Sequence, residues 1–85
     1  MNVVITGGSK GIGKGMTGEF LKRGHNVTIC SRSQKDIDQT VDELIKTSAE
    51  GQIICGTSCD VADHKQTKNL WDFANDKMGS VDIWI

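Results

Sequence analysis

Apolar positions along the chain fall into short runs that alternate with longer amphipathic segments. Residues 2–6 and 26–30 are short runs rich in β-branched residues, which favours strands. The segment between them, residues 11–23, is followed by Gly24, a suitable C-terminal stop for a helix. Its apolar residues fall near one helical face: Ile12, Met16, Phe20 and Leu21. The pattern predicts a strand, a helix and a second strand.

Ser33 is the predicted N-cap of the next helix, and Asp36 suits its first turn because the helix dipole favours an acidic side chain there. Gly51 follows as a stop. Spacings of i, i+4, i+7 and i+8 place four apolar residues on one helical stripe: Ile37, Val41, Leu44 and Ile45. We expect this stripe to pack against a sheet.

The rest of the chain repeats the alternation. Residues 52–59 hold a third predicted strand, and Asp63 with Gln66 forms a capping pair for a third helix that ends at Gly79. Residues 81–85 are the fourth predicted strand. The inward face of the third helix is expected to hold Leu70, Phe73, Ala74 and Met78.

The order β-α-β-α-β-α-β over residues 1–85 predicts an α/β fold in a single domain. Parallel strands joined by right-handed helical crossovers give a doubly wound sheet of strand order 3-2-1-4, with helices on both faces. Ligands bind such sheets at the carboxyl ends of the strands, where the strand order reverses. We therefore expect a binding site beside the end of the first strand.

Composition and charge narrow the function. The net charge is −1 and the pI is about 6.0, which argues against a dedicated binder of nucleic acid or of an anionic membrane. The longest wholly apolar run is 3–5, so no membrane-spanning segment and no secretory signal are expected. Three cysteines without a C-x-x-C pair indicate reduced thiols rather than a metal site, and we expect a cytoplasmic location.

The most informative segment lies between the first strand and the first helix, where Gly7, Gly11 and Gly13 are spaced G-x3-G-x-G. Gly7 permits a tight turn, Gly11 lets a pyrophosphate approach the backbone, and Gly13 lets the helix pack closely. The N–H groups of Gly11, Ile12 and Gly13 then face an anion at the helix N-terminus. The loop predicts dinucleotide binding.

Two alternatives stand beside this interpretation. Glycine-rich turns between a strand and a helix also occur without a ligand. Residues 8–14 match G-x-x-x-x-G-K, the start of a triphosphate-binding loop. The next residue is Gly15, where that motif requires Ser or Thr to hold Mg²⁺, and this disfavours a nucleoside triphosphatase.

The end of the second strand selects the cofactor. An acidic residue there reads the ribose 2′-hydroxyl of NAD, but the sequence has Ser31 and Arg32 instead. Arg32 suits a 2′-phosphate, Ser31 adds a hydroxyl donor, and Lys10 in the loop adds a second positive charge. The alternative is that Arg32 and Lys10 are solvated surface residues. We predict NADP(H) as the cofactor.

Asp60 and Val61 follow the third strand. In a dinucleotide site they lie beside the adenine, where the Asp60 carboxylate accepts from the amino group and Val61 offers apolar contact. The alternative is a turn residue before the Asp63 cap.

With these motifs in place, the sequence resembles the short-chain dehydrogenase/reductase family over essentially all 85 residues. The resemblance rests on residues 6–13, 31–32, 59–61 and 81–85. It implies a Rossmann fold in which Asp60 matches the adenine-contacting acid, while Lys10 and Arg32 match basic positions of NADP-dependent members. Residues 26–33 and 82–85 are further similar to the chlorophyll b reductase branch.

The family's catalytic Ser, Tyr-x-x-x-Lys pair and supporting Asn lie beyond the matched motifs, and these 85 residues contain no tyrosine. The resemblance therefore implies a truncated Rossmann domain, the NADP(H)-binding part of an oxidoreductase, that is not catalytic alone. We assign no catalytic residue and no metal site. The predicted cofactor-binding residues are Gly7, Ser9, Lys10, Gly11, Ile12, Gly13, Ser31, Arg32, Asp60 and Val61.

A different class of function stays open: a stand-alone nucleotide-binding or assembly module without enzymatic activity. Residues 81–85 form a predicted strand with an open apolar edge, and such edges recruit partners. We expect a homo-oligomer formed through this strand or through the sheet face.

Overall fold

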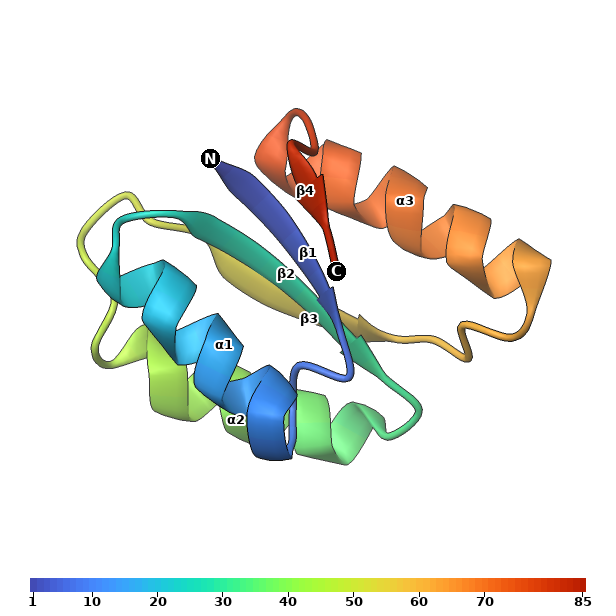
Figure 1. Cartoon of the computed structure of the whole chain (residues 1–85), viewed down its shortest axis with the longest axis horizontal. Coiled ribbons are helices and arrows are strands. Elements are labelled where there is room, and N and C mark those ends of the chain that lie inside the picture. The colour runs from blue at the N-terminus through green and yellow to red at the C-terminus, as the bar shows by residue number, and fades with distance from the viewer.

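The computed structural model describes residues 1–85 and contains the seven predicted elements in the predicted order. The strands are β1 (Asn2–Thr6), β2 (Asn26–Ser31), β3 (Ile54–Ser58) and β4 (Ile83–Trp84). The helices are α1 (Gly11–Lys22), α2 (Gln34–Ile45) and α3 (His64–Met78), as Figure 1 shows. Most boundaries lie within two residues of the predicted ones, and the exception is the end of α2, which lies at Ile45 and not next to Gly51.

All four strands are parallel, and their order in the sheet is β3-β2-β1-β4, which confirms the predicted topology. Ile29 is at the centre, opposite Ile5 of β1 and Gly56 of β3. The fourth strand is shorter than predicted: Ile83 and Trp84 lie opposite Val3 and Val4 of β1, and backbone hydrogen bonds to β1 extend to Asp82 and Ile85 on either side. The strand order reverses beside β1, so the carboxyl end of β1 is the expected place for a ligand.

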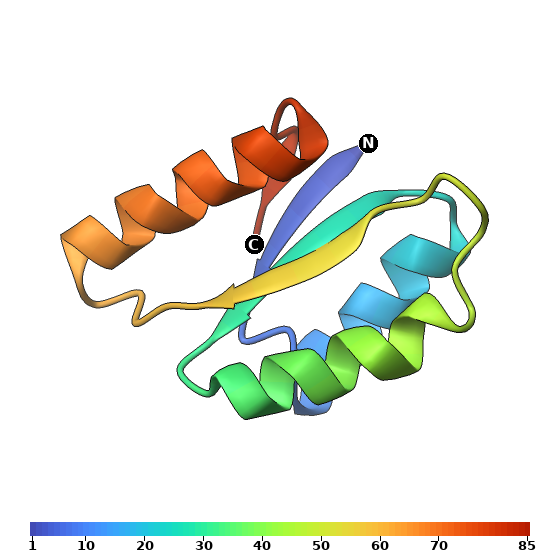
Figure 2. The same ribbon diagram turned by 180° about the vertical axis from the view of Figure 1, so that it is seen from behind.

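Helices cover both faces of the sheet, as predicted. Figures 1 and 2 show α1 and α2 side by side on one face and α3 on the other. The core is correspondingly divided in two. One cluster, on the face of α1 and α2, contains Val3, Ile5, Leu21, Val27, Ile29, Ile37 and Ile54. The other, on the face of α3, contains Val4, Cys30, Cys59, Leu70 and Ala74.

Two residues assigned to the inward helix faces are in fact exposed. Ile12 is 85% exposed and Ile45 is 54% exposed, so these assignments were wrong. At 3.6 residues per turn, Ile12 lies about 180° around α1 from the buried Leu21. The buried positions include Thr17 at 0% and Thr40 at 3% exposure, which the apolar pattern did not single out.

The predicted N-caps of α2 and α3 are confirmed, and so is the predicted stop of α3, whereas α2 ends at Ile45 and not at the predicted stop, Gly51. The Ser33 hydroxyl accepts a hydrogen bond from the Asp36 amide at 3.3 Å, and Asp63 Oδ1 accepts from the Lys65 amide at 2.9 Å. Gly79 ends α3 in the left-handed conformation, with φ of 87°. In contrast, Lys10 at the N-cap position of α1 forms no side-chain capping bond. None of the three helices is long and apolar enough to cross a membrane.

Candidate functional site

A cavity of about 590 Å³ lies at the carboxyl ends of β1, β2 and β3. It is where the topology places a ligand, beside the point at which the strand order reverses. Its lining combines the glycine loop, the segment after β2 and the segment after β3. The lining residues are Thr6, Gly7, Ser9, Lys10, Cys30, Ser31, Arg32, Ser33, Asp36, Cys59, Asp60 and Val61.

Seven of the ten predicted cofactor-binding residues lie in this lining, and three do not. The three are Gly11, Ile12 and Gly13, which directly follow Lys10 and form the first turn of α1. The fold therefore brings segments separated by fifty residues of sequence to one cavity and places the start of α1 next to it.

The glycine loop takes a backbone path that needs its glycines. Gly7 has φ of 69° and Gly11 has φ of 54°, in the region that disfavours side chains. A Cβ on Gly13 would collide with the carbonyl of Gly7, so α1 starts directly against the loop. A Cβ on Gly8 would lie 2.6 Å from Cγ2 of Ile29, so the loop also rests on the centre of the sheet.

The amide groups of Gly11, Ile12 and Gly13 have no hydrogen-bond acceptor within the chain. The first bond of the helix runs from the Lys14 amide to the Lys10 carbonyl, at 3.2 Å. No acidic side chain lies in the first turn of α1. The positive end of this helix is therefore open to an anion.

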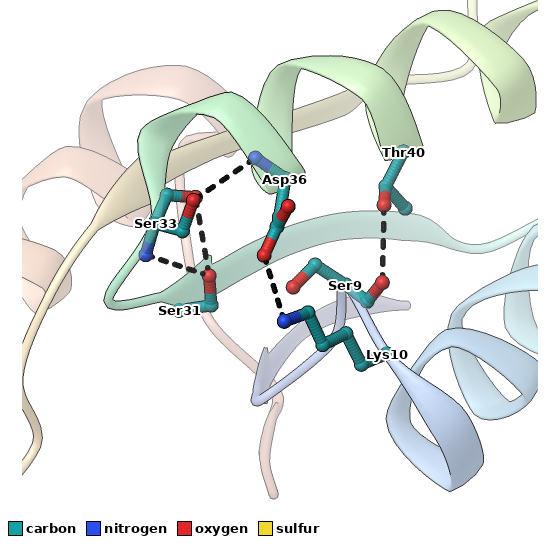
Figure 3. Close-up of polar contacts among 6 residues, drawn as sticks. All are labelled: Ser9, Lys10, Ser31, Ser33, Asp36 and Thr40. Carbon is teal, nitrogen blue, oxygen red and sulfur yellow. Dashed lines mark hydrogen bonds and ion pairs between the residues drawn. The ribbon is translucent and has the colours of Figure 1, made fainter.

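Two buried threonines hold the loop in place. Thr17 Oγ1 donates to the Gly13 carbonyl at 2.8 Å and lies 3.4 Å from the Gly8 carbonyl. Thr40 Oγ1 of α2 donates to the Ser9 carbonyl at 3.3 Å, as Figure 3 shows. Sequence reasoning missed both residues. The signal was present for Thr17, because it lies four residues after Gly13 on the same helix.

An ion pair joins two residues of the cavity lining, and the sequence did not predict it. Lys10 Nζ of the loop lies 3.0 Å from Asp36 Oδ2 in the first turn of α2, as Figure 3 shows. The Lys10 side chain is 78% exposed, whereas the Asp36 side chain is 29% exposed. The sequence had indicated only a helix-dipole role for Asp36.

Ser31 and Arg32 differ in how free their side chains are. Ser31 Oγ accepts from the Ser33 amide at 3.2 Å and donates to the Ser33 carbonyl at 3.3 Å, so its hydroxyl is engaged in the turn before α2. Arg32 is exposed and forms no ion pair within the chain. Its guanidinium is therefore available to an anion in the cavity.

The segment after β3 is fixed by a turn. Asp60 Oδ1 accepts from the Ala62 amide at 3.0 Å, and the Asp60 carbonyl accepts from the Asp63 amide at 3.0 Å. The other carboxylate oxygen of Asp60 forms no bond within the chain. The neighbouring Val61 is 55% exposed. Asp60 is thus both a turn residue, as the alternative had it, and a wall of the cavity with one free acceptor.

Two buried thiols line the inner wall. Burial, and then the neighbouring Cys59, raises the pKa of the Cys30 thiol to about 11. Burial also raises the pKa of Cys59 above its ordinary value. Both thiols are therefore protonated at neutral pH, and both belong to the core cluster on the α3 face. They act as small apolar packing residues here rather than as nucleophiles.

Comparison with known proteins shows which family the sequence matches. A family model described as short chain dehydrogenase matches residues 1–85. "Chlorophyll(ide) b reductase NOL, chloroplastic" from Oryza sativa subsp. japonica is 51% identical over 84 residues, 99% of this chain and 24% of that protein. The protein of the same name from Arabidopsis thaliana is 40% identical, with the same two shares.

The chain thus spans about a quarter of the length of these curated relatives. The similarity to the chlorophyll b reductase branch that the sequence indicated is confirmed. The cytoplasmic location is not confirmed, because both relatives are described as chloroplastic.

Solved structures share the fold. An NADPH-bound short chain oxidoreductase of Pseudomonas aeruginosa PAO1, described as having an atypical catalytic center, superposes with a TM-score of 0.92. Its sequence is 26% identical, and the match covers 98% of this chain and 32% of that one. L-sorbose reductase of Gluconobacter frateurii, solved with NADPH and L-sorbose, gives a TM-score of 0.90 at 24% identity, over 98% of this chain and 31% of that one.

Proposed function

The chain belongs to the short chain dehydrogenase family, and on that basis we propose that it binds NADP(H) in the cavity beside β1. The proposal rests on where three groups of the chain lie relative to the cavity. Arg32, with its free guanidinium, and Asp60, with its free oxygen, line one cavity at the strand-order reversal, and the uncapped start of α1 lies next to it. These residues fit the three parts of such a dinucleotide: the pyrophosphate, the ribose 2′-phosphate and the adenine.

The pyrophosphate part is proposed to bind at the start of α1. Its charges are matched by the helix dipole and by the amides of Gly11, Ile12 and Gly13, which have no other acceptor. Gly7 and Gly11 leave open space where side chains would stand, because nothing lies within 4 Å of a Cβ built on either. A phosphate can therefore approach the backbone closely at both positions.

The ribose 2′-phosphate is proposed to bind between Arg32 and Lys10. Arg32 offers a planar fork of donors that suits a phosphate, and it needs to break no contact to do so. Lys10 lines the same cavity and gives a second charge when its long side chain turns from Asp36. The hydroxyl of Ser31 contributes only if the turn to Ser33 rearranges.

The adenine is proposed to lie against the segment after β3. The free oxygen of Asp60 accepts from the adenine amino group, and the exposed side chain of Val61 covers the ring. The protonated thiols of Cys30 and Cys59 give the inner wall an apolar character, which favours a base over water there.

Reduction of a substrate is a separate question from cofactor binding. Bound NADPH supplies a hydride, but a proton donor such as the tyrosine that the family resemblance implies is not among these residues. We propose that this chain binds and orients the cofactor and does not complete a reduction by itself. The names of its relatives make chlorophyll(ide) b the candidate substrate class of the reaction that the cofactor serves.

Self-association through the outer edge of β4 is also proposed. The outer edge of β4 pairs with no strand, and Trp84 and Ile85 are 38% and 40% exposed. Trp84 also lies against the exposed Trp71 of α3, with ring centroids 5.9 Å apart. Light scattering on a size-exclusion column tests this proposal, and a monomer at tens of micromolar overturns it.

A calorimetric titration with NADPH, NADH and ATP tests cofactor binding. We expect NADPH to bind more tightly than either control. Equal affinities for NADPH and NADH would overturn the 2′-phosphate site while keeping the dinucleotide site. Tightest binding of ATP would favour a triphosphate-binding loop, and binding of none of the three would overturn the proposed function.

A further inference from the structure

The ion pair between Lys10 and Asp36 lies where the proposed 2′-phosphate binds. Its two partners line the cavity together with Ser31 and Arg32. We propose that Asp36 is a specificity-determining residue that weakens phosphate binding by holding Lys10 as its counter-ion. The inference deepens the proposed function and rests on it.

The two partners differ in mobility. Asp36 is on a helix, its amide bonded to the N-cap hydroxyl of Ser33, and most of its side chain is shielded from solvent. Lys10 is on a loop, and its side chain is 78% exposed. When an anion draws Lys10 away, Lys10 moves and Asp36 stays. A carboxylate without its cation is then left in the wall of the anion site.

The rest of the contact between the loop and α2 does not depend on this pair. Thr40, one helical turn after Asp36, bonds the Ser9 carbonyl. Glu43, another turn along the same face, forms an ion pair with Lys14 of α1. Because these two contacts remain, opening the Lys10–Asp36 pair redistributes charge within the cavity and leaves the loop in position.

The formal charges of the cavity cancel. Lys10 and Arg32 contribute two positive charges, and Asp36 and Asp60 contribute two negative ones. Removing the charge of Asp36 alone leaves a net positive cavity, which favours a ligand with a 2′-phosphate. A ligand with a free 2′-hydroxyl gains nothing from that change, because a carboxylate is itself a good acceptor for a hydroxyl.

The test uses two adenosine ligands that differ in the 2′ position alone: adenosine 2′,5′-bisphosphate and adenosine 5′-monophosphate. Their affinities are measured by calorimetry for the wild type, Asp36→Asn and the control Asp38→Asn. Asp38 is on the same helix, is exposed, bonds only Gln34 and does not line the cavity. Circular dichroism checks that α2 keeps its helical content in each variant.

We expect Asp36→Asn to bind the bisphosphate about two- to fivefold more tightly, the range of a partly exposed ion pair. The monophosphate affinity stays within about twofold or falls, and Asp38→Asn changes neither. Raising the salt concentration reduces the gain, because screening weakens charges near the surface.

Three results would overturn the inference. One is an unchanged or lower ratio of the two affinities in Asp36→Asn, and another is the same gain in Asp38→Asn, which would make it a general charge effect. The third is a wild-type chain that binds neither ligand, and only this one also overturns the proposed function. If the wild type binds both ligands and Asp36→Asn leaves the ratio of their affinities unchanged, the inference fails while the proposed function stands.

Discussion

The side-chain oxygen of Gln66 accepts a hydrogen bond from the backbone amide of Asp60 at 2.8 Å. The predicted capping pair of α3 thus also contacts residues outside the helix. Gln66 Nε2 donates to the Asp63 carboxylate at 3.3 Å, while Gln66 Oε1 binds the segment after β3. The first turn of α3 therefore fixes the residue proposed to contact adenine, although Gln66 does not line the cavity.

Replacing Gln66 with alanine should loosen that residue. We expect Gln66→Ala to lower the free energy of unfolding by about 1 kcal/mol, the usual net contribution of one such bond. The affinity for adenosine 5′-monophosphate should fall about two- to fivefold. Lys68→Ala is the control, because Lys68 is exposed on the same helix and pairs only with Asp72. Equal affinities in the two variants would contradict a positioning role for Gln66.

Two neighbouring glycines of α1 should respond in opposite directions to alanine. Gly13→Ala places a methyl group against the carbonyl of Gly7, so we expect a loss of at least about 2 kcal/mol in urea unfolding and a loss of nucleotide binding. Gly15 has nothing within 4 Å of its Cβ position and lies inside the helix. Gly15→Ala should stabilise the chain by up to about 1 kcal/mol. Similar effects of the two changes would show that α1 does not pack closely against the carbonyl of Gly7.

Reversing the charge of Arg32 should alter cofactor preference. We expect Arg32→Asp to weaken NADPH at least about tenfold, and NADH by much less, because only NADPH carries the phosphate that Arg32 is proposed to bind. Arg23→Asp makes the same change of net charge away from the cavity, since Arg23 follows α1 and pairs with Glu19. If the Arg23 variant weakened NADPH as strongly, the effect would come from net charge alone.

The Cys30 thiol should make the stability depend on pH in the alkaline range. Its native pKa is about 11, against an ordinary value of 9.0, so the unfolded chain releases this proton at a lower pH than the native one. The resulting stabilisation is complete below about pH 9 and is lost as the pH rises toward about 11. Urea midpoints at about pH 8 and about pH 10.5 measure this for the wild type and Cys30→Ala. Parallel declines in the two proteins would assign the dependence to other groups.

Much of the fold could be predicted because its signals are local. β-branched runs, the Ser33 and Asp63 caps and the stops at Gly24 and Gly79 lie within a few residues of the elements they define. Strict alternation of strand and helix then left few possible topologies. The glycine spacing identified the loop, because its backbone geometry requires glycine at particular positions.

What the sequence did not predict depends on contacts between distant segments. Thr40 is 31 residues from Ser9, and Asp36 is 26 residues from Lys10, so neither contact has a local signature. A threonine also counts as polar in a hydrophobic pattern, so the pattern places it on the surface. It can nevertheless be buried when its hydroxyl donates to a backbone carbonyl. Ile12 was misplaced for the opposite reason, because an apolar side chain was assumed to face inward.

Because the amides at the start of α1 are open, the stability of the protein depends on the composition of the solution. Their hydrogen bonds are completed by water or by whatever anion is present. An anion that binds there binds the native chain and not the unfolded one, so by mass action it raises the melting temperature as its concentration exceeds its dissociation constant. Changing the buffer anion from chloride to phosphate then affects the melting temperature in the way that adding a ligand does.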